Sequence, residues 1–89
     1  MRNILLDTAA VTSIRDLHSL LKEAFSFPSW YGNNLDALFD CLTDLGEETV
    51  LTLLGTEHLA QSLGPRWSAF ADTLSDAAAQ NPRFTFSLQ

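Results

Sequence analysis

Three short strand-like segments, separated by pairs of helix-like repeats, constrain the fold of this chain more than any other feature. The strand-like segments are residues 2–6, 49–54 and 83–88. Consecutive strands joined by helices lie parallel, because the helix carries the chain back to the edge where the next strand starts. The pattern predicts an α/β fold with a three-stranded parallel sheet covered by four helices, in the order β-αα-β-αα-β. The Leu-rich segment 49–54 is typical of a strand buried on both faces.

Apolar residues that recur every three or four positions predict the four helices. In the second of them, the leucines at positions 35, 38, 42 and 45 fall on one face. The residues expected to cap or end the helices are Ser13, which with Asp16 resembles a capping box, and Pro28 for the first, Asn33 or Asn34 and Gly46 for the second, Thr56 for the third, and Asn81-Pro82 for the fourth.

The length and composition are those of a small globular protein. A chain of 89 residues, 46% of them hydrophobic and 18% charged, is expected to form one domain over residues 1–89. Its single cysteine, Cys41, excludes an intrachain disulfide and a site with several thiolates, which favours a reducing compartment. The first residues resemble neither a secretion signal nor a membrane span, so we expect a cytoplasmic protein. We also expect it to act as a monomer.

Acidic residues dominate the middle of the chain. The formal net charge is −6, and residues 23–65 contain seven acids and no lysine or arginine. Such a field opposes binding to nucleic acid or an anionic membrane and favours a basic partner. The alternative interpretation is a solvated acidic face that serves only solubility.

The second predicted helix carries a stripe of carboxylates. Asp36, Asp40 and Asp44 are spaced four residues apart and therefore stack on one face, opposite the leucines. Each like-charged pair at this spacing costs the helix about 0.2 to 0.5 kcal/mol, and only Asp36 lies where the helix dipole favours an acid. Asp40 and Asp44 lack this benefit, so we predict that a molecule outside the fold uses them.

Aromatic residues precede and accompany this stripe. Trp30 and Tyr31 lie in the loop before the helix, where exposed aromatic side chains suit contact with a protein partner. We expect Tyr31 to pack onto the core. Phe39 lies between the leucine face and the acid face, and the sequence leaves open whether it belongs to the core or to an interface.

Other chemistry has weaker support in the sequence. Three aspartates on one exposed helix have similar surroundings, whereas acid–base catalysis needs carboxylates in different ones. Their helical spacing also differs from that of a calcium loop, so no metal, cofactor or catalytic residue is predicted. Cys41 is expected to be a core or boundary residue, and Trp67 a core residue. His18 and His58 are expected at the surface or its boundary.

Residues 28–42 (PSWYGNNLDALFDCL) resemble the signature of the barstar family of intracellular ribonuclease inhibitors. That signature runs Pro-x-aromatic-Tyr-Gly-x-Asn-Leu-Asp-Ala-Leu-x-Asp, and the similarity extends over the whole chain. The resemblance implies a barstar-like fold, in which the acidic helix and the preceding loop plug the active site of a small basic secreted ribonuclease. Asp40 then matches the acid that meets the catalytic cations of the enzyme, and Asp36 matches its neighbour one turn earlier.

The resemblance adds further partner-binding residues and also shows departures. Trp30, Asn34, Leu35 and Asp76 match contact positions of the family, and Phe39 stands where a tryptophan is common. The departures are Trp30 for a tyrosine, Asp44-Leu45 for a Gly-Trp pair, Asp76 for a glutamate, Gln80 at a position that can be acidic, and Pro82 where some members have a cysteine.

Three hypotheses follow from these residues. The first is a ribonuclease inhibitor that protects the producing cell. The second is a barstar-like immunity protein that neutralises a different basic toxin domain, which the departures from the family pattern favour. The third is a small enzyme that uses the aspartates and would turn over substrate without a protein partner.

Overall fold

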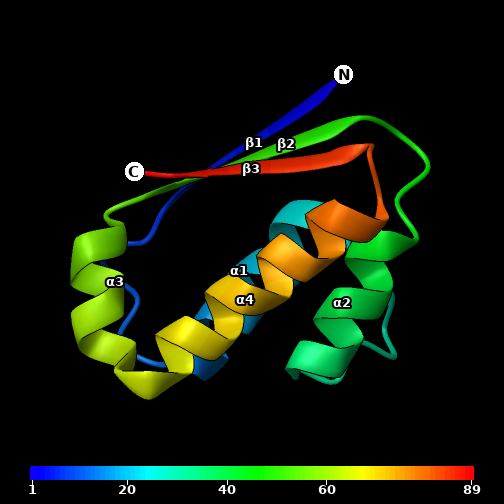
Figure 1. Ribbon diagram of the computed structural model, residues 1–89. Coiled ribbons are helices and arrows are strands. Elements are labelled where there is room, and N and C mark those ends of the chain that lie inside the picture. Colours follow the sequence, from blue (N-terminus) through cyan, green and yellow to red (C-terminus); the bar gives the residue numbers. More distant parts are fainter.

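The computed structural model describes residues 1–89 and has the predicted order of strands and helices. The three strands form one parallel sheet in the order β1-β2-β3, and all four helices lie on the same side of it (Figure 1). The α/β fold class and the β-αα-β-αα-β order are thus confirmed. The elements are β1 (Arg2–Asp7), α1 (Ile14–Phe25), α2 (Leu35–Thr43), β2 (Thr49–Leu54), α3 (Thr56–Leu63), α4 (Pro65–Gln80) and β3 (Phe84–Leu88).

The two faces of the sheet differ. In the central strand β2, Leu51 and Leu53 point toward the helices and are fully buried, whereas Val50, Thr52 and Leu54 are only half-buried. On the neighbouring strand β1, Leu5 is 65% exposed on the same outer face. The prediction that residues 49–54 are buried on both faces was therefore wrong, because every helix packs against one face.

Leucine and phenylalanine side chains of α1, α2 and α4 fill the space beneath the sheet. The predicted apolar stripes supply this core, and each fully buried side chain of this size stabilises the fold by about 1.5 to 3 kcal/mol. Trp67 packs against this core but stays half-buried. The fully buried leucine and phenylalanine side chains of the three helices are Leu17, Leu21, Leu38, Leu42, Phe70 and Leu74.

Helix starts agree only in part with the predicted caps. The Ser13 hydroxyl accepts a hydrogen bond from the Asp16 amide at 3.1 Å, but the reciprocal bond of a capping box is replaced by one from the Thr12 hydroxyl to the Asp16 carboxylate. Thr56 is the first residue of α3 and does not cap it. Gly55 takes the capping position with φ of 78°, a left-handed conformation that glycine adopts without steric cost.

Helix α2 ends earlier than the leucine spacing predicts. Its last residue is Thr43, and Asp44 is the C-cap, so Leu45 and Gly46 lie beyond the helix.

No helix of the protein has both the length and the apolar character that a bilayer span requires.

Candidate functional site

Helix α2 presents its carboxylates on the face opposite to its buried side chains. Leu38 and Leu42 are fully buried against the core, while Asp36, Asp40 and Asp44 are exposed. Only two carboxylates of the protein accept a hydrogen bond, those of Asp7 and Asp16. The three acids of α2 are therefore held on a firmly packed helix with their oxygens free for a partner.

The start of α2 is fixed by local hydrogen bonds. Asn34 is the N-cap, and its side-chain oxygen accepts a hydrogen bond from the Ala37 amide at 2.8 Å. Its amide nitrogen donates to the carbonyl of Gly32 at 3.4 Å. A Cβ on Gly32 would lie 2.9 Å from that nitrogen, so any other residue here would displace the Asn34 side chain. Leu35, the first residue of the helix, is half-buried.

The two loop aromatics point in opposite directions. Tyr31 is 4% exposed and belongs to the core, as predicted, whereas Trp30 is 63% exposed. Phe39 is half-buried and packs against the edge of the core, so part of its ring remains accessible beside the acids. Exposed aromatic side chains such as Trp30 are enriched at protein interfaces.

A buried hydrogen bond anchors this loop. His18 is only 2% exposed, and its Nδ1 lies 2.5 Å from the phenol oxygen of Tyr31. The prediction of a surface or boundary histidine was wrong, because His18 lies on the apolar stripe of α1 and Tyr31 provides the polar partner that burial requires. Burial lowers the pKa of His18 and raises the pKa of Tyr31.

The buried histidine predicts a stability that falls in mild acid. Below about pH 6.5 the unfolded chain binds a proton on His18 more readily than the folded protein, so the free energy of unfolding decreases as the pH drops. We expect urea denaturation between about pH 7 and 5 to show a smaller decrease in the His18→Gln variant. The exposed His58→Gln variant should behave like the parent, and equal pH dependence in all three proteins would contradict this role for His18.

Hydrogen bonds from the Asn81 side chain, which the sequence did not predict, hold the end of α2. Asn81 is 6% exposed, and its amide nitrogen donates to the carbonyls of Leu42 at 3.0 Å and Leu45 at 3.1 Å. Its side-chain oxygen accepts from the Arg83 amide at 3.0 Å. Asn81 thus joins the end of α4 to the end of α2. The predicted contact residue Asp76 is exposed on α4, five residues before Asn81.

Cys41 does not have the surroundings of a reactive thiol, and the His, Cys, Asp and Glu side chains form no metal site. Cys41 is buried on the core side of α2, as predicted, and burial together with Asp40 and Asp44 raises the pKa of its thiol. A raised pKa makes a thiol a poor nucleophile at neutral pH. No three His, Cys, Asp or Glu side chains are arranged to hold a metal ion.

Comparison with known proteins agrees with this architecture of a small α/β protein that carries an exposed acidic helix. Residues 1–89 match the family described as "Barstar (barnase inhibitor)", and the chain therefore belongs to the barstar family. A curated relative from Bacillus subtilis (strain 168), "Putative ribonuclease inhibitor YrdF", is 51% identical over 43 residues. The aligned part covers 48% of this chain and 47% of that protein, so the chain spans about half the length of the relative.

Proposed function

We propose that this protein is an inhibitor of a small basic ribonuclease, which it binds and occludes without chemical turnover. The observation that carries the proposal is the row of free carboxylates at Asp36, Asp40 and Asp44 on the firmly packed helix of a barstar-family chain. The name of the curated relative, a ribonuclease inhibitor, supports the same class of partner. We propose further that it acts as a monomer in the cytoplasm of the producing cell.

The mechanism follows from the geometry of α2. A ribonuclease binds RNA phosphates with arginine, lysine and histidine side chains, and Asp36 and Asp40 offer carboxylates to the same cations. Leu38 and Leu42 hold the helix against the core, so little conformational entropy is lost when the acids are bound. Trp30 and Phe39 cover the rim and exclude water, which strengthens the charge pairs.

Exposed Trp30 supplies a prediction that separates binding from folding. The Trp30→Ala variant should keep its free energy of unfolding within about 0.5 kcal/mol, because the indole is solvated in the free protein. Its affinity for a ribonuclease should fall about tenfold or more, since the indole becomes buried in the complex. Leu5→Ala is the control, because Leu5 is equally exposed on the outer face of the sheet and should affect neither quantity. Unchanged affinity in Trp30→Ala would remove Trp30 from the interface.

The acidic field predicts association that depends on salt. Positions 23–65 contain seven acids and no lysine or arginine, so they attract a basic enzyme, and this attraction is screened over about 8 to 10 Å in physiological salt. In stopped-flow experiments, the association rate constant should fall about tenfold or more between low and high ionic strength, with a much smaller change in dissociation. Association that is insensitive to salt would contradict electrostatic steering.

A titration of small basic microbial ribonucleases, including barnase, tests the proposed function. Cleavage of a fluorogenic RNA is followed as the purified protein is added. We expect activity to reach zero at one inhibitor per enzyme for at least one ribonuclease. Residual activity of every enzyme at excess protein would contradict the proposal.

A second candidate function is the neutralisation of a different basic toxin domain. Asp44-Leu45, Asp76 and Gln80, which depart from the family pattern that the sequence resembles, favour it because they change the surface at the ends of α2 and α4. Capture of a toxin that is not a ribonuclease, from cells that encode this protein, would support this alternative over the first.

A further inference from the structure

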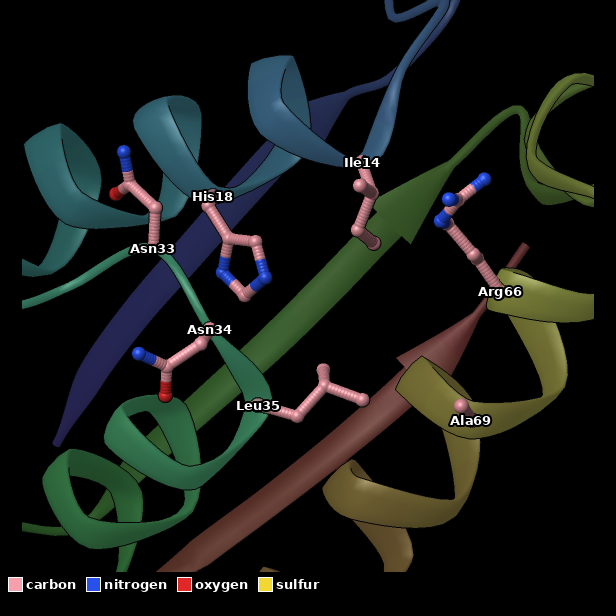
Figure 2. Close-up of a pocket in the computed structure, with 7 residues that line it drawn as sticks. All are labelled: Ile14, His18, Asn33, Asn34, Leu35, Arg66 and Ala69. Carbon is pink, nitrogen blue, oxygen red and sulfur yellow. The ribbon is translucent and has the colours of Figure 1, made fainter.

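A cavity opens beside the start of α2, next to the surface assigned to the ribonuclease. Its volume is about 260 Å³, and its walls come from the first turns of α1, α2 and α4 (Figure 2). Asn34 and Leu35 belong both to this cavity and to the predicted interface. A partner that covers the start of α2 therefore also covers the mouth of the cavity.

Three helices begin at this cavity. Ile14 and Leu35 are the first residues of α1 and α2, and Arg66 is the second residue of α4. The N-terminus of each helix carries a partial positive charge of roughly half an elementary charge, from N–H groups without helical partners. The Ser13 and Asn34 side chains each satisfy one amide of α1 and α2, and α4 has no side-chain cap. Asp16 and Asp36 lie in the first turns of α1 and α2, but neither lines the cavity, where Arg66 is the only acidic or basic charge.

A buried imidazole adds a free donor to the cavity wall. Nδ1 of His18 is the only hydrogen-bond partner of the Tyr31 phenol. We assign the phenol as the donor, because a neutral phenol that accepted from Nδ1 would leave its own buried proton without an acceptor, and this assignment places the ring proton of His18 on Nε2. Nε2 has no hydrogen-bond partner, yet no buried polar side-chain atom of the protein is unsatisfied. Since His18 lines the cavity and is otherwise enclosed, Nε2–H faces the cavity (Figure 2).

Arg66 is the lining residue that carries a full positive charge, in addition to the partial charges of the helix N-termini. It is the first basic residue after the acidic stretch 23–65, and its guanidinium donates no hydrogen bond within the protein. Figure 2 shows its side chain extending from the start of α4 on the side of Ile14. The donors of this cavity suit a carboxylate, which only accepts hydrogen bonds and pairs with a guanidinium through two of them.

We propose that this cavity receives an aspartate or glutamate side chain of the ribonuclease, with Arg66 as the residue that selects for it. This inference rests on the proposed function. In this contact the ribonuclease supplies the acid and the inhibitor the cation, whereas in the rest of the proposed interface the inhibitor supplies the acids. Arg66 and the Nε2–H of His18 bind the carboxylate, and Ile14 and Leu35 contact its methylene groups. The inhibitor would thereby reject a basic ribonuclease that lacks an acid at this point of its rim.

Reversing the charge of the Arg66 side chain tests the proposal. Binding to a ribonuclease that the unaltered protein inhibits is measured for Arg66→Glu, Arg66→Lys and Arg15→Glu. Arg15 is exposed in the same first turn of α1 as the cavity residue Ile14 but does not line the cavity. Arg15→Glu therefore makes the same change in net charge without changing the cavity. We expect dissociation of Arg66→Glu to be at least about tenfold faster, because a charge pair becomes a repulsion. Arg66→Lys should lose less, and Arg15→Glu should bind as well as the parent or better.

The partner side of the contact is found by a double-mutant cycle. Each aspartate and glutamate on the rim of the enzyme's active site is replaced by its amide, and one replacement should cause no further loss when combined with Arg66→Ala. Binding of Arg66→Glu equal to or tighter than that of the parent would overturn the inference and leave the proposed function intact. Failure of the unaltered protein to inhibit any ribonuclease would overturn both. Saturable binding of inorganic phosphate to the free protein, with unchanged dissociation of Arg66→Glu, would assign the cavity to a free anion and also overturn the inference.

Discussion

The Asp40→Ala variant is expected to inhibit its ribonuclease at least about 100-fold more weakly than the parent protein. Asp40 is the middle acid of the exposed row on α2, and the proposed complex buries it against the cations that bind RNA phosphate. Removing one partner of a buried charge pair costs about 3 to 5 kcal/mol, and each 1.4 kcal/mol is a factor of ten in affinity. Titration of ribonuclease activity with the variant measures the effect.

Two further variants make the Asp40 result specific. Asp40→Asn keeps the shape of the side chain, so it should lose nearly as much affinity if charge is what matters. Glu57→Gln removes the same charge from the exposed first turn of α3, on the far side of α4 from α2 (Figure 1), and should inhibit almost like the parent. Full inhibition by Asp40→Ala would contradict the assignment of Asp40, as would an equal loss in Glu57→Gln.

The Asn81→Ala variant is expected to show the largest loss of stability among single polar substitutions outside the acidic surface. The substitution leaves the part-buried carbonyl of Leu45 without a donor and the amide of Arg83 without an acceptor. The buried carbonyl of Leu42 keeps the long hydrogen bond from the Leu45 amide at 3.4 Å. Buried groups left in this way cost about 1 to 3 kcal/mol. For a chain of this size, we expect a melting temperature lower by roughly 10 to 20 °C.

The neighbouring positions provide the controls for Asn81. Gln80→Ala, at an exposed position of α4, should change the melting temperature little. Asn81→Asp keeps the acceptor for Arg83 but places an oxygen opposite both carbonyls, so it should be as destabilising as alanine or more. A fully stable Asn81→Asp variant would show that the two donated hydrogen bonds do not hold α2 in place.

The fold was predictable because each element carries its own local signal. Leucines three and four residues apart define the buried face of α2, and the resulting opposite face correctly places Asp36, Asp40 and Asp44 in solvent. Asn33 and Asn34 were both identified as cap candidates from their residue type and position, and the hydrogen bond in the structure assigns the cap to Asn34. The outer face of the sheet was misjudged because Leu-rich strands have the same sequence pattern whether one or both faces are covered.

The contacts between distant elements were not predictable from local patterns. His18 was placed near the surface, although its spacing of four residues from Ile14 and three from Leu21 put it on the apolar stripe of α1. That signal could have shown its burial, but not its bond to Tyr31. The cavity around Arg66 brings together three helix starts that lie far apart in the sequence, and such a site appears only once the helices are packed.

Competition between this protein and RNA for one enzyme tests the proposed occlusion most directly. Binding of a short RNA analogue that cannot be cleaved is measured on the ribonuclease as the inhibitor is added. The proposed function predicts that one equivalent of inhibitor displaces the analogue completely, because Asp36 and Asp40 occupy the cations that hold its phosphates. A stable ternary complex of enzyme, RNA analogue and inhibitor would contradict occlusion by α2.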